Sequence, residues 1–318
     1  MICHYSMSIQ GRSHVSRGIP CQDSSYSSEL TEKYGLAVIA DGVGSCKYSD
    51  EASKIAVSTI VKNLEEQRNN LNDDNILSLI EESYSKAKKE IEQLAIDAKQ
   101  PINEYDTTLT VALYDGDKVY YGHSGDGGII GLSDDGLYVK ITQPQKGPDG
   151  ISVVPLRFSD SWEFGSVNNI SSLLLATDGV YDTFLPYLLK GASNEIYVPL
   201  ISYYIDNNQI SINKDNQSEI GQEIRDFLTS DSCNSITDDM TVAALFNPLK
   251  KASIRDPTYY EEPDWEKLQK KWNKAAYSDM RTQVESEITQ PVMTKIVASN
   301  NKIKLPGYRP RKKSKKRR

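Results

Sequence analysis

The sequence predicts a mixed α+β fold in which two long helices are followed by a run of antiparallel strands. Two segments, 49–67 and 75–98, carry apolar residues at helical spacing. Residues 107–142 instead form four β-rich runs separated by Asp-Gly or Gly-rich turns, a pattern typical of consecutive hairpins. Helices followed by hairpins indicate antiparallel strands that are covered by helices.

The remaining elements follow from apolar runs and turn residues. Residues 34–40 (YGLAVIA) precede an Asp-Gly pair, which predicts a buried strand that ends in a turn. The stretch 143–169 is punctuated by proline and glycine and predicts a long loop or flap. Two further apolar runs, 172–177 and 240–246, predict strands, with mixed helical segments between them up to about Leu228.

The charge of the chain is distributed unevenly. The formal net charge is −7, yet residues 309–318 hold eight Lys or Arg and no acid, so the rest of the chain carries about −15. An acidic body is unlike that of a dedicated nucleic-acid binder, whose folded surface is basic. The basic end predicts instead a tail that is solvated or that binds an acidic partner or nucleic acid.

Cysteine usage and hydropathy predict a cytoplasmic protein without a membrane span. The N-terminal residues lack the pattern of a signal peptide, and no stretch approaches the roughly 20 apolar residues of a transmembrane helix. The cysteines form no CxxC pair, so they indicate neither a zinc site nor a disulfide framework: Cys3, Cys21, Cys46 and Cys233.

Acidic residues recur where predicted strands begin or end. Asp41, Asp178 and Asp238 each border an apolar run, and Asp126 lies in a Gly-rich turn. A single Asp-Gly pair more often marks a turn than a ligand. Four such acids at strand ends can converge, however, and carboxylates with bound waters suit Mg²⁺ or Mn²⁺. Histidine and cysteine are nearly absent from these loops, which disfavours zinc.

Six short motifs occur in an order that resembles a known enzyme family. They are CQDSS from Cys21, ADGVGS from Ala40, DTTLTVA from Asp106, SGDGG from Ser124, ATDGVYD from Ala176 and DDMTVAAL from Asp238. The series, over about residues 8–247, resembles the metal-dependent type 2C serine/threonine protein phosphatases, in particular their compact bacterial members. The resemblance implies a four-layer αββα sandwich of two antiparallel sheets flanked by helix pairs.

The resemblance also implies a reaction and a set of ligands. Phosphoserine and phosphothreonine would be hydrolysed by a water that bridges two Mg²⁺ or Mn²⁺ ions. Asp41 would bridge both metals, and the Gly42 carbonyl, Asp178 and Asp238 would complete the two sites. Asp126 would hold a third, weaker metal.

Other residues match the motifs in less direct roles. Asp23 matches an acid that lies close to the metals and acts through water, and Thr107 and Thr108 match a signature that indicates structural residues beside the site. Asp239 stands where the family usually has Asn, and Asp182 is either a helix cap or a ligand.

Two positions depart from the family pattern. Many members carry an arginine five residues before the N-terminal acid, where it binds the substrate phosphate, but this chain has Gly18 there. Arg17 or His14 could replace that contact, with Arg12 a weaker candidate. Some relatives have a histidine after the first Asp-Gly, where this chain has Val43, so either water or His14 would protonate the leaving group.

The organisation and the partners follow from the same interpretation. A phosphatase-like catalytic domain is expected over 1–248, a charged helical extension over 249–290 and a basic disordered tail over 291–318. The partners would be a phosphoprotein substrate and the kinase that it opposes. The alternatives are a non-catalytic regulator or scaffold that acts through its C-terminal segment, which the missing arginine motivates, and a nucleic-acid binder that acts through the tail.

Overall fold

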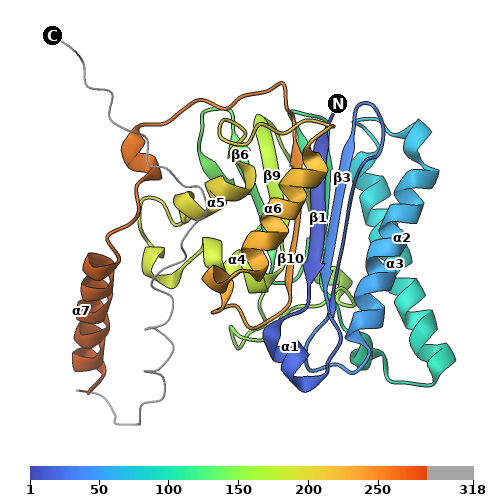
Figure 1. Cartoon of the computed structure of the whole chain (residues 1–318). Helices are drawn as coiled ribbons and strands as arrows, with labels where there is room; N and C mark the ends of the chain where they lie inside the picture. Colours follow the sequence, from blue (N-terminus) through green and yellow to red (C-terminus); the bar gives the residue numbers. More distant parts are fainter. Residues whose placement is uncertain (285–318) are drawn as a thin grey trace.

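The computed structural model describes residues 1–284 and shows a β-sandwich between two layers of helices (Figure 1). Each sheet has five antiparallel strands. The first sheet consists, in spatial order, of β1 (Cys3–Ile9), β10 (Met240–Phe246), β9 (Ile170–Ala176), β6 (Gly128–Ser133) and β7 (Tyr138–Lys140). The second consists of β2 (Asp23–Glu29), β3 (Gly35–Asp41), β4 (Leu109–Tyr114), β5 (Val119–Ser124) and β8 (Glu163–Val167). The predicted αββα sandwich is confirmed.

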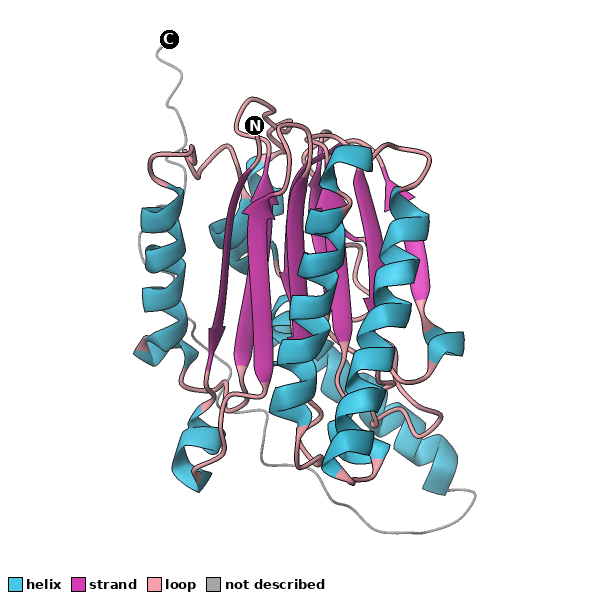
Figure 2. Ribbon diagram, turned by 90° about the vertical axis from the view of Figure 1, so that its right-hand side faces the viewer, coloured by secondary structure: helices cyan, strands magenta, loops and turns pink. Residues whose placement is uncertain are grey.

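Helices cover the outer face of each sheet (Figures 1 and 2). The second sheet carries α2 (Ser49–Glu66) and α3 (Ile76–Ala98), close to the bounds that the apolar spacing predicts. The first sheet carries α4 (Asp178–Phe184), α5 (Val198–Ile205) and α6 (Gln217–Thr229). A six-residue helix, α1 (Arg12–Arg17), connects β1 to the loop before β2.

Short 3₁₀ turns occupy several of the connections. They are η1 (Arg68–Asn70), η2 (Ile102–Tyr105), η3 (Ser159–Ser161), η4 (Tyr187–Leu189), η5 (Asp231–Cys233) and η6 (Pro257–Tyr260). Of these, η2 lies directly before the DTTLTVA motif, and η3 lies directly before β8, so the last part of the segment 143–169 predicted as a loop or flap is a strand. The residues of the hydrophobic core come mainly from the helices and strands.

The central strands are apolar on both faces because each sheet is buried on both sides. All six residues of β4 and all seven of β9 and β10 are buried. One apolar cluster fills the space between the sheets, and two others lie between each sheet and its helices. Burial of this kind provides the main stabilisation of the fold.

Three strands were not predicted from the sequence. They are β1, β2 and β8, which all lie at the edge of a sheet. Edge strands have one unpaired side and carry more polar residues, so they lack a continuous apolar run. β2, for example, has the sequence DSSYSSE, and only its first residue is buried.

The C-terminal extension forms a helix, as its apolar spacing predicts. α7 (Trp265–Val284) follows an extended segment, and its first turn contacts the body through Trp265, whose ring lies 5.2 Å from that of Tyr197. Trp272 lies beside Tyr187, at 5.4 Å between ring centroids. The predicted tail over 291–318 lies outside the described residues, and the three-part division of the chain stays a prediction. Within residues 1–284, no helix has the length and apolar character that crossing a membrane requires.

Candidate metal centre

Three predicted ligands meet at one end of the sandwich, the end where α1 lies. Asp41 ends β3, Asp126 lies in the turn between β5 and β6, and Asp178 begins α4. One carboxylate oxygen from each residue lies within 4.8 Å of those of the other two. The antiparallel topology explains this convergence, because β3 and β9 end, and β6 begins, at the same end of the two sheets.

Asp23 lies directly beside this cluster. In the register of the second sheet, Asp23 is paired with Asp41. The Thr177 hydroxyl donates a 2.9 Å hydrogen bond to Asp23 Oδ2, whereas Oδ1 is buried without a hydrogen-bond partner among the described residues. Burial raises the pKa of Asp23 to about 7. An unpartnered buried oxygen is costly, which indicates that a proton, water or cation normally satisfies it.

Burial and mutual repulsion also act on the three clustered acids. Desolvation raises the pKa of Asp41 well above its usual range, and the negative charges of Asp23 and Asp178 raise it further. Desolvation and the charge of Asp178 raise the pKa of Asp126 to about 6. The pKa of Asp178 is likewise raised, first by burial. Such an all-oxygen, electron-rich site fits a hard divalent cation, which would relieve the repulsion.

Backbone contacts fix the position of Asp41. Its N–H donates to the Thr108 hydroxyl at 2.9 Å, and its carbonyl accepts from the Thr107 hydroxyl at 2.9 Å and from the Thr108 N–H at 2.7 Å. The two threonines therefore have the structural role that their motif indicates. Gly42 packs so closely on α2 that a Cβ would lie 2.6 Å from the Ser49 carbonyl oxygen, so only glycine fits here. The role of its carbonyl as a ligand stays a prediction.

Two adjacent aspartates before β10 have opposite environments. The Asp238 side chain is 60% exposed and lies outside the cluster of three. The Asp239 side chain is 3% exposed, and its two oxygens accept 2.6 Å hydrogen bonds from the backbone N–H groups of Gly11 and Gln22. Asp239 thus joins the α1 segment and the strand that begins at Asp23 to the start of β10, a role that the motif comparison left open.

His14 is buried between these two acids. Its Nδ1 lies 2.9 Å from Asp239 Oδ1, and its Nε2 lies 3.7 Å from Asp238 Oδ1. The Nδ1 contact is a close approach of charges and not an aligned hydrogen bond, because Nδ1 is buried without a hydrogen-bond partner among the described residues. Sequence reasoning selected His14 but not this partnership.

Arg17, the arginine candidate beside Gly18, is hydrogen-bonded within α1 and makes no ion pair with the clustered acids among the described residues. Gly18, which stands where the family has arginine, caps the end of α1 in a left-handed conformation with φ of 67°. Arg17 is exposed, and its guanidinium donates to the Ser13 carbonyl at 3.1 Å and to the Ser13 hydroxyl at 2.9 Å. Arg17 would have to leave Ser13 to reach a phosphate.

The segment predicted as a flap adds a cation that sequence reasoning missed. Lys146 Nζ lies 3.9 Å from Asp126 Oδ2. Lys146 pairs with Val153 in a β-bridge, which makes the outer part of the flap a small hairpin. The sequence contained no signal for this contact, because it depends on how the flap folds back over the Gly-rich turn.

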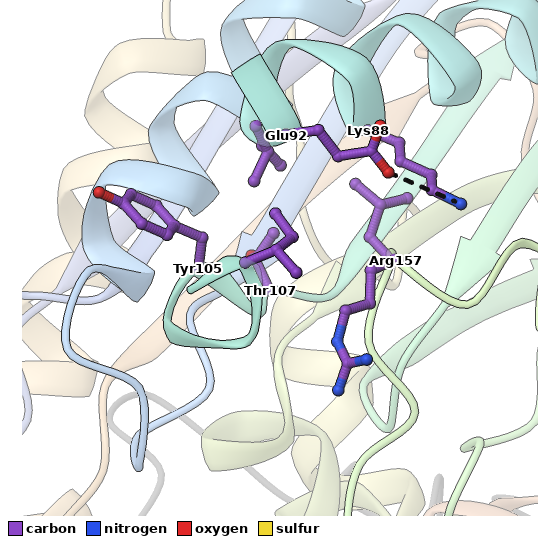
Figure 3. A pocket seen from close by; sticks show the side chains of 8 residues that line it. Lys88, Glu92, Tyr105, Thr107 and Arg157 are labelled. Carbon is purple, nitrogen blue, oxygen red and sulfur yellow. Dashed lines mark ion pairs between the residues drawn. The ribbon is translucent and has the colours of Figure 1, made fainter. Parts of the chain in front are cut away.

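Leu156 and Arg157, which follow the small hairpin of the flap, bind this segment to the body of the protein. The Arg157 Nε donates a 2.6 Å hydrogen bond to Asp106 Oδ1, and the backbone N–H of Leu156 donates to the Thr107 carbonyl at 2.8 Å. Figure 3 shows Arg157 below α3, with its guanidinium turned away from the Lys88–Glu92 pair.

The structure also bears on Asp182, for which the sequence left two roles open. Asp182 lies inside α4 and not at its N-cap, which is Thr177, so the helix-capping alternative is not supported.

Comparisons with known proteins agree with this architecture. The model of the protein phosphatase 2C family matches residues 10–226. A solved bacterial serine phosphatase, crystallised as a point mutant, is 15% identical, with a TM-score of 0.56, covering 78% of this chain and 99% of that chain. Stp1, a serine/threonine phosphatase of Staphylococcus aureus, is 16% identical with a TM-score of 0.54, covering 78% of this chain and 95% of that chain.

The serine/threonine phosphatase of S. agalactiae is 15% identical with a TM-score of 0.55, covering 77% of this chain and 99% of that chain. At these identities the structures show a shared fold. Among curated proteins, no sequence match was found.

Proposed function

The chain belongs to the protein phosphatase 2C family, and on that premise we propose that it is a metal-dependent phosphatase of phosphoserine and phosphothreonine. The observation that carries the proposal is the convergence of Asp41, Asp126 and Asp178, whose carboxylate oxygens lie within 4.8 Å of one another. A family fold that had lost catalysis would have no need to keep these mutually repelling acids together.

The chain's own residues supply the ligands. We propose that Asp41, the Gly42 carbonyl, Asp178 and Asp238 hold two Mg²⁺ or Mn²⁺ ions and that Asp126 holds a third. Bound divalent cations would stabilise charge on the phosphoryl oxygens and lower the pKa of a bound water. Asp238 is 60% exposed and its Oδ1 accepts a 2.9 Å hydrogen bond from the Asp239 N–H, so its side chain would have to turn from this contact to reach the cluster. The support is the all-oxygen donor set and the raised pKa values of Asp41, Asp126 and Asp178.

Asp23 and His14 are proposed to handle protons and water. Asp23 Oδ1 has no hydrogen-bond partner in the described part of the chain, so it can accept a hydrogen bond from a water that faces the substrate. His14, when protonated, can donate a proton from Nε2 to the leaving oxygen, and the Asp239 carboxylate 2.9 Å from Nδ1 would stabilise the protonated ring. Hydrolysis of a phosphate monoester needs both positioning and charge stabilisation, and these residues contribute to the positioning.

Two observations favour a non-catalytic scaffold as the second candidate. Gly18 occupies the position of the usual phosphate-binding arginine and serves as a helix cap. The C-terminal α7 also leaves the Trp272 side chain 47% exposed, which is unusual for tryptophan and suits a binding surface. The nucleic-acid alternative rests on residues outside the described part of the chain, and the kinase partner stays a prediction.

The two candidates are separated by an activity assay on the full chain. Purified protein is incubated with p-nitrophenyl phosphate and with phosphothreonine peptides, with Mn²⁺ or with EDTA. We expect hydrolysis that requires the divalent ion. A folded protein that binds Mn²⁺ but hydrolyses neither substrate would contradict the catalytic proposal and favour the scaffold.

A further inference from the structure

The proposed reaction needs a cation that binds the substrate phosphate beside the metals. In the N-terminal segment, Gly18 ends α1 and Arg17 is hydrogen-bonded to Ser13. Arg12 is exposed at the start of α1 and makes no ion pair with the clustered acids within residues 1–284. Arg157 is also engaged, since its Nε donates to Asp106 Oδ1 at 2.6 Å. None of these arginines forms an ion pair with a clustered acid in the described part of the chain.

Lys146 is placed differently. Its ammonium lies 3.9 Å from Asp126 Oδ2, and its positive charge also acts on Asp178 and Asp182. Among the lysines and arginines of the described residues, it is the one whose ion pair is with an acid of the cluster of three. Its side chain is 38% exposed, so it lies on the solvent side of the centre, from which a substrate must approach.

The backbone of Lys146 is held in place while its ammonium stays available. The preceding residue, Gln145, donates its backbone N–H to the Gly125 carbonyl at 2.7 Å, and its side-chain oxygen accepts from the Gly125 N–H at 3.3 Å. Gly125 adjoins Asp126, so these bonds fix the flap to the turn that carries the acid. A distance of 3.9 Å is longer than a hydrogen bond, and within residues 1–284 the ammonium makes none.

We propose that Lys146 binds the phosphate group of the substrate at the open side of the carboxylate cluster, in the role that an arginine of the N-terminal segment has in many relatives. The inference rests on the proposed function. Lysine is a compact charge with three rotatable donors and binds phosphate as a point charge, whereas arginine imposes a planar, bidentate geometry. The phosphate contact of this enzyme therefore comes from the flap.

The same geometry allows a purely structural role for Lys146, which the experiment must distinguish from phosphate binding. Lys146 could serve only to offset the negative charge of Asp126. In that case, its removal would strengthen the binding of Mn²⁺, because a competing cation is lost, and would leave the affinity for phosphate unchanged. A phosphate ligand has the opposite signature, with weaker phosphate binding and little change for the metal.

The test compares three variants of the full chain with wild type. K146M removes the charge and keeps the length of the side chain, K146R restores a charge, and K89M removes a lysine from the exposed surface of α3. For each protein, Mn²⁺ binding is measured by titration calorimetry without substrate, and the binding of inorganic phosphate is measured on the Mn²⁺-loaded protein. KM and kcat for p-nitrophenyl phosphate are determined in parallel.

We expect K146M to weaken phosphate binding and to raise KM about tenfold, the size of one charge-assisted hydrogen bond. Mn²⁺ affinity should change by less than about threefold, K146R should recover most of the loss, and K89M should match wild type. If wild type is active, unchanged phosphate binding in K146M, or a change in Mn²⁺ affinity alone, would overturn the inference. A wild type that binds no Mn²⁺ and hydrolyses no substrate would instead overturn the proposed function.

Discussion

Both ends of the β-sandwich gather aspartates, but the two ends differ in how their charges are compensated. At the end opposite α1, Lys250 contacts Asp117 and lies 2.8 Å from Asp134. At the α1 end, Asp41, Asp126 and Asp178 face one another, and Lys146 approaches Asp126 only to 3.9 Å. The lysine neutralises the acids at the first end, whereas the acids at the α1 end keep a repulsion that an external cation would relieve.

The largest effect is expected from removing a charge at the uncompensated end. Asp41→Asn and Asp178→Asn should each lower Mn²⁺-dependent hydrolysis of p-nitrophenyl phosphate by at least about 10²-fold. Even indirect partners of metal ligands cost roughly 10- to 100-fold, so a direct ligand should cost no less. Asp134→Asn is the matched control at the other end, and we expect it to keep wild-type activity with at most about 1 kcal/mol lost in stability.

The comparison would fail if Asp134→Asn lost activity as strongly as Asp178→Asn. Such a result would mean that the aspartates affect activity through folding alone. Thermal unfolding of each variant in EDTA provides the control for this possibility.

The metal-free protein should become less stable as pH rises. The pKa of Asp23 is raised to about 7 in the folded chain, against 3.8 in the unfolded chain. Between these values the folded state holds a proton that the unfolded state has lost, so the free energy of unfolding falls from about pH 4 to about pH 7. The fall amounts to about 4 kcal/mol at most for this group.

Asp23→Asn is the control, because its side chain is neutral at every pH. Urea unfolding in EDTA at about pH 5 and about pH 8 should show a smaller loss of stability in the variant than in wild type. Mn²⁺ should restore wild-type stability at the higher pH, since it binds only the folded chain. An equal pH dependence in both proteins would contradict the assignment of this proton to Asp23.

The adjacent residues Asp238 and Asp239 should differ in how much each contributes to stability, and this effect is smaller than those above. Asp239→Ala leaves the buried N–H groups of Gly11 and Gln22 without an acceptor, and we expect a loss of about 2–4 kcal/mol in the free energy of unfolding. Asp238→Ala removes an exposed side chain and should change stability in EDTA by less than about 0.5 kcal/mol. Its effect should appear instead in Mn²⁺-dependent activity. Equal destabilisation by the two substitutions would refute the separate roles.

The sequence predicted the parts of the fold that carry continuous apolar patterns. The buried strands β3, β9 and β10 and the helices α2 and α3 were found close to their observed bounds. The edge strand β2 was missed because six of its seven residues are only partly buried. Its place in the sheet is set by pairing with β3, which is a tertiary property.

For a similar reason, only some residues of the site could be predicted from the sequence. Asp41, Asp126 and Asp178 could be selected because each lies in a recognisable motif at a strand end. The phosphate-binding candidate Lys146 could not, because its contact with Asp126 depends on the folding of the flap. The role of Asp239 depends on the distant backbone groups of Gly11 and Gln22, near the other end of the chain, which no local pattern reveals.

The central claim is that the cluster of aspartates binds divalent cations, and titration of the metal-free full chain with Mn²⁺ by calorimetry tests it most directly. We predict that wild type binds at least two ions per chain and that Asp178→Asn, although folded, loses at least one of them. A folded wild type that binds no Mn²⁺ would contradict the account, because the repulsion among Asp41, Asp126 and Asp178 would then have no cation to relieve it.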